Sequence, residues 1–247
     1  MDTVNLRRSV DLHRSKAIVL LMGLWLMTGY QAIAQKDYKY IRKFQERYDD
    51  KPIHYGFFFA APTTHFKITH SDAFQTADSA YRISSPNTMG FRVGFIFNAY
   101  MNDRFDFRSN PSVSLYSRTV NFDYPGGLQK SEKRESTWLN VPILFKYKSE
   151  RRTNSRMYLI AGGSFAIETN VRKNESQGAG RLNTGTADFT LEYGVGFEQF
   201  FQFFKFAPEL RFSQGIPNLY RTNALNPTSI GIQRLTTNTV TLYLNFE

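Results

Sequence analysis

The chain has 247 residues with 23 Phe and 14 Tyr, a mean hydropathy of −0.42 and no Cys, so it is rich in aromatic side chains without being hydrophobic on average. The lack of cysteine excludes a disulfide framework and a thiolate metal site. The formal net charge of +10 suits nucleic acid, an anionic membrane or solubility alone, but no block of Lys and Arg is large enough to favour nucleic acid, so we expect no nucleic-acid partner.

The first 34 residues have the features of a cleavable secretory signal. Four basic residues precede an apolar run over 17–27, and the small-residue pattern Ala-Ile-Ala follows at 32–34. We therefore expect residues 1–34 to be a signal peptide that is cleaved after Ala34. The alternative, a membrane-spanning helix, needs about 20 apolar residues, whereas this run has eleven before Thr28 interrupts it.

Residues 35–53 form a polar segment that is expected to lie in the periplasm. The sequence leaves open whether this segment is a short helix or a disordered arm. The folded domain is expected to occupy residues 54–247.

From residue 54 onward, apolar and polar residues alternate in runs that indicate strands with one apolar face. Most runs reach the roughly 9 to 11 residues that a tilted strand needs to cross a bilayer. The connections alternate between long (20, 13, 14 and 23 residues) and short (3, 7 and 4 residues). A transmembrane barrel has this asymmetry because every second connection is a tight periplasmic turn. The eight predicted strands are His54–Lys67, Thr88–Tyr100, Arg104–Phe122, Ser136–Lys148, Arg156–Val171, Thr186–Glu198, Phe203–Ser213 and Thr237–Phe246.

Charged residues are concentrated on one face of strand after strand. A Lys or Arg that faces lipid at mid-depth costs about 2–4 kcal/mol, so in a membrane barrel these charges must face the lumen. Eight strands enclose little more than their own side chains, which predicts a filled interior and argues against a porin channel. The expected lumen-facing ionic network, with a structural role, consists of Arg92, Arg108, Lys146, Glu192, Glu198, Lys205, Glu209 and Arg211.

The predicted fold is therefore all-β: an eight-stranded antiparallel outer-membrane β-barrel of OmpA/OmpX size with a filled polar lumen. It is expected in the outer membrane of a Gram-negative bacterium, with both chain ends in the periplasm. The alternative is a soluble lipid-carrying barrel, in which the apolar faces would point inward and the charges would coat the outside. The asymmetry of the connections favours the membrane barrel.

Aromatic residues on the opposite parity are expected to contact lipid or to form an interfacial girdle. A cluster of phenylalanines around the turn near residue 202 could instead be an apolar patch for a partner protein, and the girdle is the preferred interpretation. The lipid-facing and girdle residues are Phe91, Phe95, Phe97, Phe200, Phe201, Phe203, Phe204 and Phe206.

Opposite charges predict a register for the last short hairpin. In an antiparallel pair, the numbers of two residues that face each other have a constant sum, which defines the register. A sum of 403 pairs Glu192 with Arg211 and Glu198 with Lys205, whereas a sum of 401 would pair Glu192 with Glu209. Like charges directly opposite destabilise a sheet, so 403 is preferred. Glu209 then needs another cation, for which Arg92 and Arg108 are candidates.

Some residues resist the strand assignments. Pro111, Pro142 and Pro208 fall inside predicted strands, where each removes a ladder donor and is expected mainly at a bulge or an edge. The apolar parity of the third strand also flips between Leu115 and Val120, which indicates either a bulge or an extension beyond the membrane.

No catalytic, cofactor-binding or metal-binding residue is predicted. The mature chain has only His54, His65 and His70, and no pair has the spacing of a helical zinc motif. His70-Ser71-Asp72 places the residue types of a hydrolase side by side, but a triad is recognised by geometry rather than by sequence adjacency.

Four stretches resemble the PorT family of outer-membrane β-barrel proteins over roughly residues 51–247. They are Lys51–Phe58; Asp106–Leu115; Asn140–Ser149 with Asn154–Tyr158; and Phe206–Ser213 with Gly215, Pro217 and Asn218. The resemblance implies that the prolines at 111, 142 and 208 are family features. It also implies a non-enzymatic barrel that is required for protein export by the type IX secretion system and, in gliding species, for export of surface adhesins.

The C-terminal stretch has the alternating, aromatic-ended form of a barrel insertion signal, carried by Val240, Leu242, Leu244 and Phe246. Glu247 departs from that form because a charged residue follows the aromatic one. The expected partners are outer-membrane lipid, the barrel assembly machinery and other envelope proteins of the secretion system.

Two other functions stay open. One is a stand-alone small barrel that binds or adheres through its external loops. The other is a lipid-modifying enzyme, which would require His65 or His70 to approach a serine and an acid near the outer rim.

Overall fold

A computed structural model describes residues 42–70, 82–123, 129–169, 184–220 and 232–247, except for the side chain of Lys130. The predicted signal peptide, residues 1–34, lies outside the described residues. The chain forms two compact units with the boundary after Arg42, and the second unit consists of residues 43–247. Within the described ranges, no helix is long and apolar enough to span a membrane.

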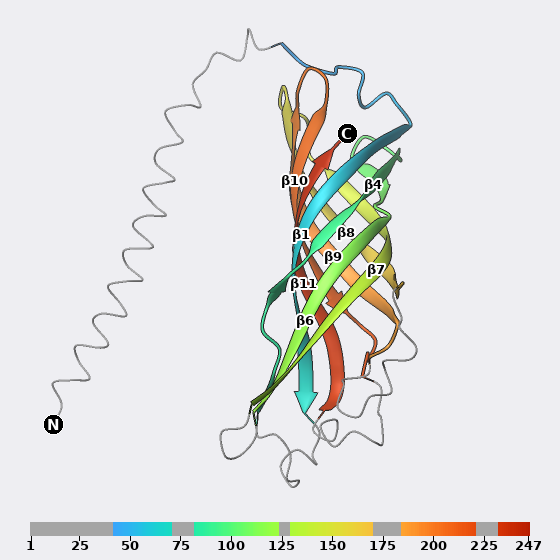
Figure 1. Ribbon diagram of the computed structural model, residues 1–247. Coiled ribbons are helices and arrows are strands. Elements are labelled where there is room, and N and C mark those ends of the chain that lie inside the picture. Colours follow the sequence, from blue (N-terminus) through green and yellow to red (C-terminus); the bar gives the residue numbers. More distant parts are fainter. Residues whose placement is uncertain (1–41, 71–81, 124–128, 170–183, 221–231) are drawn as a thin grey trace, which may run out of the picture. The chain divides into compact units, whose positions relative to one another are not determined.

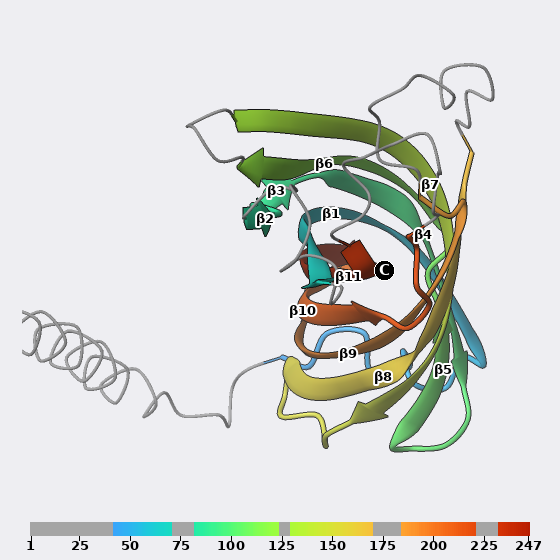
Figure 2. The same ribbon diagram turned by 90° about the horizontal axis from the view of Figure 1, so that it is seen from below.

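The second unit is a closed antiparallel ring of eight strands (Figures 1 and 2). β1 closes the ring because it pairs with β11 on one side and with β4 on the other. Eleven segments make eight strands, since β2, β3 and β4 together form the second strand and β5 and β6 form the third. The segments are β1 Ile53–His70, β2 Arg82–Ser84, β3 Thr88–Met89, β4 Phe91–Tyr100, β5 Phe105–Ser109, β6 Ser112–Asp123, β7 Gln129–Lys148, β8 Ser155–Glu168, β9 Ala187–Phe200, β10 Lys205–Gly215 and β11 Ile232–Phe246.

The predicted fold is confirmed, and all eight predicted strands are present. Two ends of the ring can be distinguished. The turn end holds the short connections 101–104, 149–154 and 201–204 together with Glu247, and the loop end is where β1, β6, β8 and β10 finish. The C-terminus and the start of β1 lie together at the turn end (Figure 1).

The in-strand prolines do not shift the register. β5 and β6 are separated at Asn110-Pro111, yet both pair with β4 and with β7 in one continuous register. Pro111 still accepts a bond through its carbonyl, from the N–H of Phe95 at 3.1 Å. Each proline therefore removes one donor without requiring the bulge that the sequence suggested.

The apolar parity flip in the third strand is not a bulge either. Pairing of β6 with β7 is unbroken from Ser112 opposite Asn140 to Asp123 opposite Gln129. What changes is the interior, which becomes apolar at the loop end. The buried cluster there consists of Phe66, Ile83, Val120, Phe122, Leu219, Ile232 and Leu235.

β7 begins at Gln129, seven residues before the predicted start at Ser136, which shortens the preceding connection. Residues 129–135 are polar on both faces and so show no alternation. Their strand conformation comes from backbone pairing with β6.

Candidate functional site: the charged interior of the barrel

All eight residues of the predicted ionic network are buried inside the ring. Each is at most 4% exposed, and Arg108, Lys146, Glu198, Lys205 and Arg211 are fully buried. Their burial follows from strand parity, because side chains alternate between the two faces of a strand. The apolar residues of the opposite parity are exposed on the outside, for example Phe95, Ile143 and Leu191.

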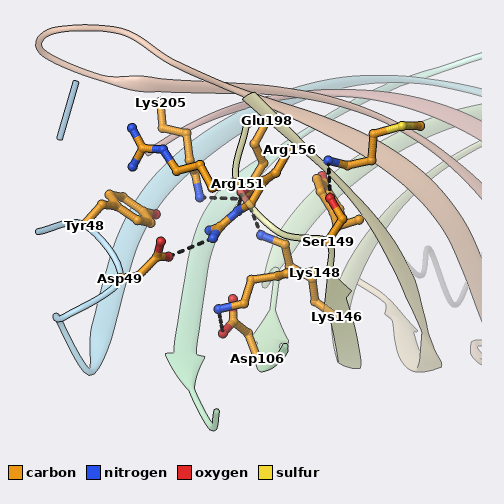
Figure 3. A network of polar contacts seen from close by, with 12 residues as sticks. Tyr48, Asp49, Asp106, Lys146, Lys148, Ser149, Arg151, Arg156, Glu198 and Lys205 are labelled. Carbon is orange, nitrogen blue, oxygen red and sulfur yellow. Dashed lines mark hydrogen bonds and ion pairs between the residues drawn. The ribbon is translucent and has the colours of Figure 1, made fainter. Parts of the chain in front are cut away.

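Glu198 is the centre of the network near the turn end (Figure 3). Its carboxylate forms ion pairs with Lys146, Arg156 and Lys205, and the Lys205 Nζ to Oε1 distance is 3.0 Å. Arg156 also pairs with Asp49 at 2.9 Å. Three cations thus share one buried carboxylate.

Glu247 supplies a second carboxylate at this end. It continues the inward parity of Tyr243 and Asn245, so its side chain enters the lumen and is 1% exposed. It pairs with Arg108 at 2.5 Å and with Lys205 at 2.8 Å. Burial alone would raise the pKa of Glu247, but the charges of Arg108 and Lys205 outweigh burial and lower it well below the ordinary value of 4.5. The charge after the C-terminal aromatic residue is therefore part of the interior.

A second cluster occupies the middle of the lumen. Arg211 pairs with Glu209 and, at 2.9 Å, with Glu192. Glu209 also lies 3.6 Å from Arg108 and accepts a 2.7 Å hydrogen bond from the Tyr158 hydroxyl. The extra cation that Glu209 needs is thus supplied in part by Arg108, one of the two candidates predicted.

The predicted register of β9 and β10 is wrong by two residues. Opposite residue numbers sum to 405, as for Arg211 opposite Gly194 and Ser213 opposite Glu192. The ion pairs Glu192–Arg211 and Glu198–Lys205 nevertheless form, because long side chains reach the diagonal neighbour across the strands. The predicted inward faces of both strands are still correct, because a register shift of two residues does not change the face on which a side chain lies.

Arg92 differs from the other predicted network residues because it forms no ion pair with a carboxylate in the described ranges. Its guanidinium donates to the hydroxyls of Tyr116 and Tyr243 and, at 2.7 Å, to Ser114. Arg118, which was not predicted, is held similarly: it lies over the Tyr116 ring at 4.5 Å and donates to the Thr64 hydroxyl at 3.2 Å. Aromatic residues thus surround these two cations, Arg92 and Arg118.

Residues 43–52, referred to below as the strap, cross the turn end without forming a helix. Arg151 donates to the carbonyls of Phe44 and Gln45, and Asn154 accepts the Phe44 N–H at 2.8 Å. Tyr48 enters the mouth of the barrel and donates to Glu247 at 2.8 Å. The strap therefore plugs the turn end.

Packing fixes Tyr48 in that position. Its ring stacks on His54 at a centroid distance of 4.0 Å, meets Phe200 edge-on at 5.3 Å and lies under the Lys205 ammonium at 4.5 Å. Burial, together with the carboxylates of Glu247 and Glu198, raises the pKa of the Tyr48 hydroxyl well above 10.0. The hydroxyl thus stays protonated and remains a donor.

One predicted girdle residue is placed differently. Phe200 is fully buried, because β9 runs to residue 200 and its even-numbered residues face inward. Phe201, Phe203 and Phe204 are exposed around the turn. The remaining predicted residues lie on the outer face, namely Phe91, Phe95, Phe97 and Phe206.

The four residues of the predicted insertion signal lie on the outer face of β11. Val240, Leu242 and Leu244 are 38–48% exposed, and Phe246 packs against Phe57 with a centroid distance of 5.4 Å. This places an apolar stripe at the seam where β11 meets β1.

Little space is left inside. One cavity of about 20 Å³ lies near Arg118 and Asp188, enough for about one water molecule. A hollow of about 390 Å³ lies at the turn end beside Asp50, Tyr100 and Arg151. The cavity beside Arg118 and Asp188 is therefore too small for a substrate.

No group of three or more His, Cys, Asp or Glu in the described parts of the chain is arranged to hold a metal. His65 has outward parity and faces Asn238 on β11, and His54 is buried against the strap. Ser71 and Asp72 lie outside the described residues. Among the described residues, neither His54 nor His65 forms a hydrogen bond with a serine or an acid.

Sequence reasoning missed several interior residues. Arg118, Arg156 and Tyr158 have the inward parity of their predicted strands, so the alternation could have found them. Tyr48 carries no local signal, because its partner Glu247 is 199 residues away.

The family described as "Outer membrane protein beta-barrel domain" matches residues 33–221. Among solved structures, the chain is similar to the outer membrane protein OprG from Pseudomonas aeruginosa, with 12% identity and a TM-score of 0.44 over 78% of this chain and 92% of that chain. It is also similar to Ail, the attachment invasion locus protein of Yersinia pestis, with 8% identity and a TM-score of 0.36 over 79% of this chain and 98% of that chain. No curated protein gives a significant match.

Proposed function

Because the chain belongs to the outer-membrane protein β-barrel domain family, we propose that it is a sealed, non-enzymatic barrel that supports protein export by the type IX secretion system. It acts through assembly with other envelope proteins of that system, and in gliding species it supports the export of surface adhesins. The observation that carries the proposal is the charged, side-chain-filled lumen, in which buried Glu198 pairs with three buried cations. The proposed working surfaces are therefore the outside of the barrel and its two ends.

The secretion role is supported by the four stretches that resemble the PorT family. The first stretch, Lys51–Phe58, joins the strap to β1 and contains His54, which packs on Tyr48. The third contains Pro142, whose carbonyl accepts a 2.8 Å bond from Ser109 on the neighbouring strand. Residues of these stretches therefore take part in contacts that hold the strap and the barrel wall together.

The turn end is proposed to face the periplasm. Short connections of outer-membrane barrels lie on that side, and the strap and the C-terminus share this end. It offers envelope partners two features: the side chain of Phe203, which is 87% exposed at the tip of the β9–β10 turn, and the hollow beside Asp50. The C-terminal apolar stripe is proposed as the segment that the barrel assembly machinery reads during insertion.

The test is deletion of the gene and measurement of the export of a cargo with a C-terminal secretion signal. The proposal expects cargo to accumulate inside the cell and export to return with the wild-type chain. Phe203→Ser should restore export only partly, whereas Met89→Ser, a matched change of a 73% exposed residue toward the loop end, should restore it fully. Normal export in the deletion strain would contradict the proposal.

A second candidate is binding or adhesion through the loop end. The observation that favours it is the length of β7, whose residues 129–135 extend the β6–β7 hairpin beyond its apolar outer residues. A deletion strain that exports cargo normally but loses surface binding would support this candidate.

A further inference from the structure

The outer face of β1 divides into an apolar band and a basic edge. Its outward residues from Ile53 to Thr63 are apolar or small apart from that last threonine. Ten residues at about 3.3 Å each, in a strand tilted by about 40°, rise about 25 Å, which is the height of the lipid-facing band of such barrels. The next outward positions, His65 and Lys67, therefore lie at the level of the lipid headgroups.

β11 adds a third basic group to this edge. Lys67 is opposite Thr236, and Thr69 is opposite Arg234, so Lys67 and Arg234 are diagonal neighbours. Diagonal neighbours lie about 7–8 Å apart, within reach of long side chains. His65, Lys67 and Arg234, called the basic edge below, thus form one patch on adjacent strands.

The basic edge has no acidic counterpart in the described ranges. Lys67 is exposed and makes no ion pair there, and Arg234 is exposed and uses one nitrogen to bond the Ile216 carbonyl at 2.7 Å. Its apolar neighbours are exposed as well, with Met89 at 73% and Ile216 at 49%. Cations beside exposed apolar side chains fit a surface where acyl chains end and phosphates begin.

The opposite wall is different. On β7, outward Lys133 forms a 2.8 Å ion pair with outward Glu135 on the same strand. Its charge is neutralised within the protein, so it has less to offer an anionic lipid. Within the described ranges, the β1–β11 wall therefore presents to the membrane basic groups that have no carboxylate partner.

We propose that the basic edge binds the phosphate groups of lipid A, the phosphorylated glycolipid of the outer leaflet. The choice of lipid A over a phospholipid of the inner leaflet rests on the orientation proposed above, in which the loop end faces outward. Each cation near an anionic lipid surface contributes about fivefold to binding, equivalent to about 1 kcal/mol. The exposed groups Lys67 and Arg234 together should contribute about 25-fold.

Native mass spectrometry of the folded mature chain in detergent tests this with three probes: bisphosphorylated lipid A, dephosphorylated lipid A and phosphatidylglycerol. The wild type should retain bisphosphorylated lipid A best. The double variant Lys67→Gln with Arg234→Gln should bind it about 25-fold more weakly, and Lys133→Gln should stay within about twofold of wild type.

Folding of each variant is checked by heat-modifiable gel mobility. If the double variant does not fold, Lys67→Gln alone should still lose about fivefold. Unchanged lipid A binding in the folded variant overturns the proposal. Preference for phosphatidylglycerol that the variant abolishes overturns the assignment to lipid A and points to an inverted barrel. The export assay is independent of these outcomes.

Discussion

Glu198→Gln removes the charge shared by Lys146, Arg156 and Lys205 while keeping the side-chain volume. Two of the three cations retain another carboxylate, since Lys205 pairs with Glu247 at 2.8 Å and Arg156 with Asp49 at 2.9 Å. Lys146 retains no carboxylate partner in the described ranges, and its ammonium group then has only the Tyr158 ring, whose centroid is 4.4 Å away. Breaking a buried ion pair by removing one partner costs about 3–5 kcal/mol, which we expect as the loss of unfolding free energy.

The structure also predicts a rescue. Lys146→Met in the Glu198→Gln background removes the buried charge that has lost its partner, and that uncompensated charge is the main cost of breaking a buried pair. The double variant should therefore recover most of the loss. The control is Glu135→Gln, which removes an exposed pair with Lys133 and should cost at most about 1 kcal/mol.

The assay is urea unfolding of the mature chain in lipid vesicles, followed by the fluorescence of Trp138 and by heat-modifiable mobility. Trp138 is 3% exposed and is the only tryptophan after residue 34. A loss below about 1 kcal/mol for Glu198→Gln, or a double variant no more stable than that single variant, would show that Glu198 does not compensate the buried charge of Lys146.

Three further predictions concern the packing of the interior, its dependence on pH and the orientation of the barrel in the membrane. Gly196→Ala should cost about 1–3 kcal/mol in urea unfolding, because a Cβ there would lie 2.2 Å from the Tyr158 ring. Glu247 has a lowered pKa, so its contribution to stability is complete above about pH 4.5 and is lost on acidification; Glu247→Gln should flatten this part of the stability–pH curve. A tag near Asn102 should be unreachable on intact cells, whereas one near Asn226, outside the described residues, should be labelled.

Each of these outcomes has a control or a contradicting result. Gly185→Ala should be tolerated better than Gly196→Ala, because the nearest atom to its Cβ would be 3.6 Å away. Equal acid sensitivity of the wild type and the Glu247→Gln variant would show that the carboxylate is not paired in the folded state. Labelling at Asn102 would mean that the orientation is inverted.

The alternation of residues predicted the fold because the two environments of this sheet differ so sharply. Arg92 lies between Phe91 and Val93, so only one orientation of the strand is favourable: the charge faces the lumen and the apolar side chains face lipid. The same rule places Phe200 inside once β9 is continued to its observed end, and Glu247 inside at the position directly after β11. Phe200 was assigned to the girdle and Glu247 to neither face, because both lie at strand boundaries, where alternation gives the weakest signal.

Other features required information that local patterns do not contain. The register of β9 and β10 was predicted from direct charge pairing, whereas Arg211 reaches Glu192 diagonally past Gly194. The start of β7 depends on backbone pairing with β6. The strap depends on contacts such as Tyr48 with Glu247, which are far apart in the chain.

Conductance of the purified mature chain in a planar lipid bilayer measures whether the barrel is sealed by its own side chains. Insertion should leave no stable open-channel current, because the buried ion pairs and the strap fill the lumen. A reproducible, long-lived unit conductance from the wild-type chain would contradict it.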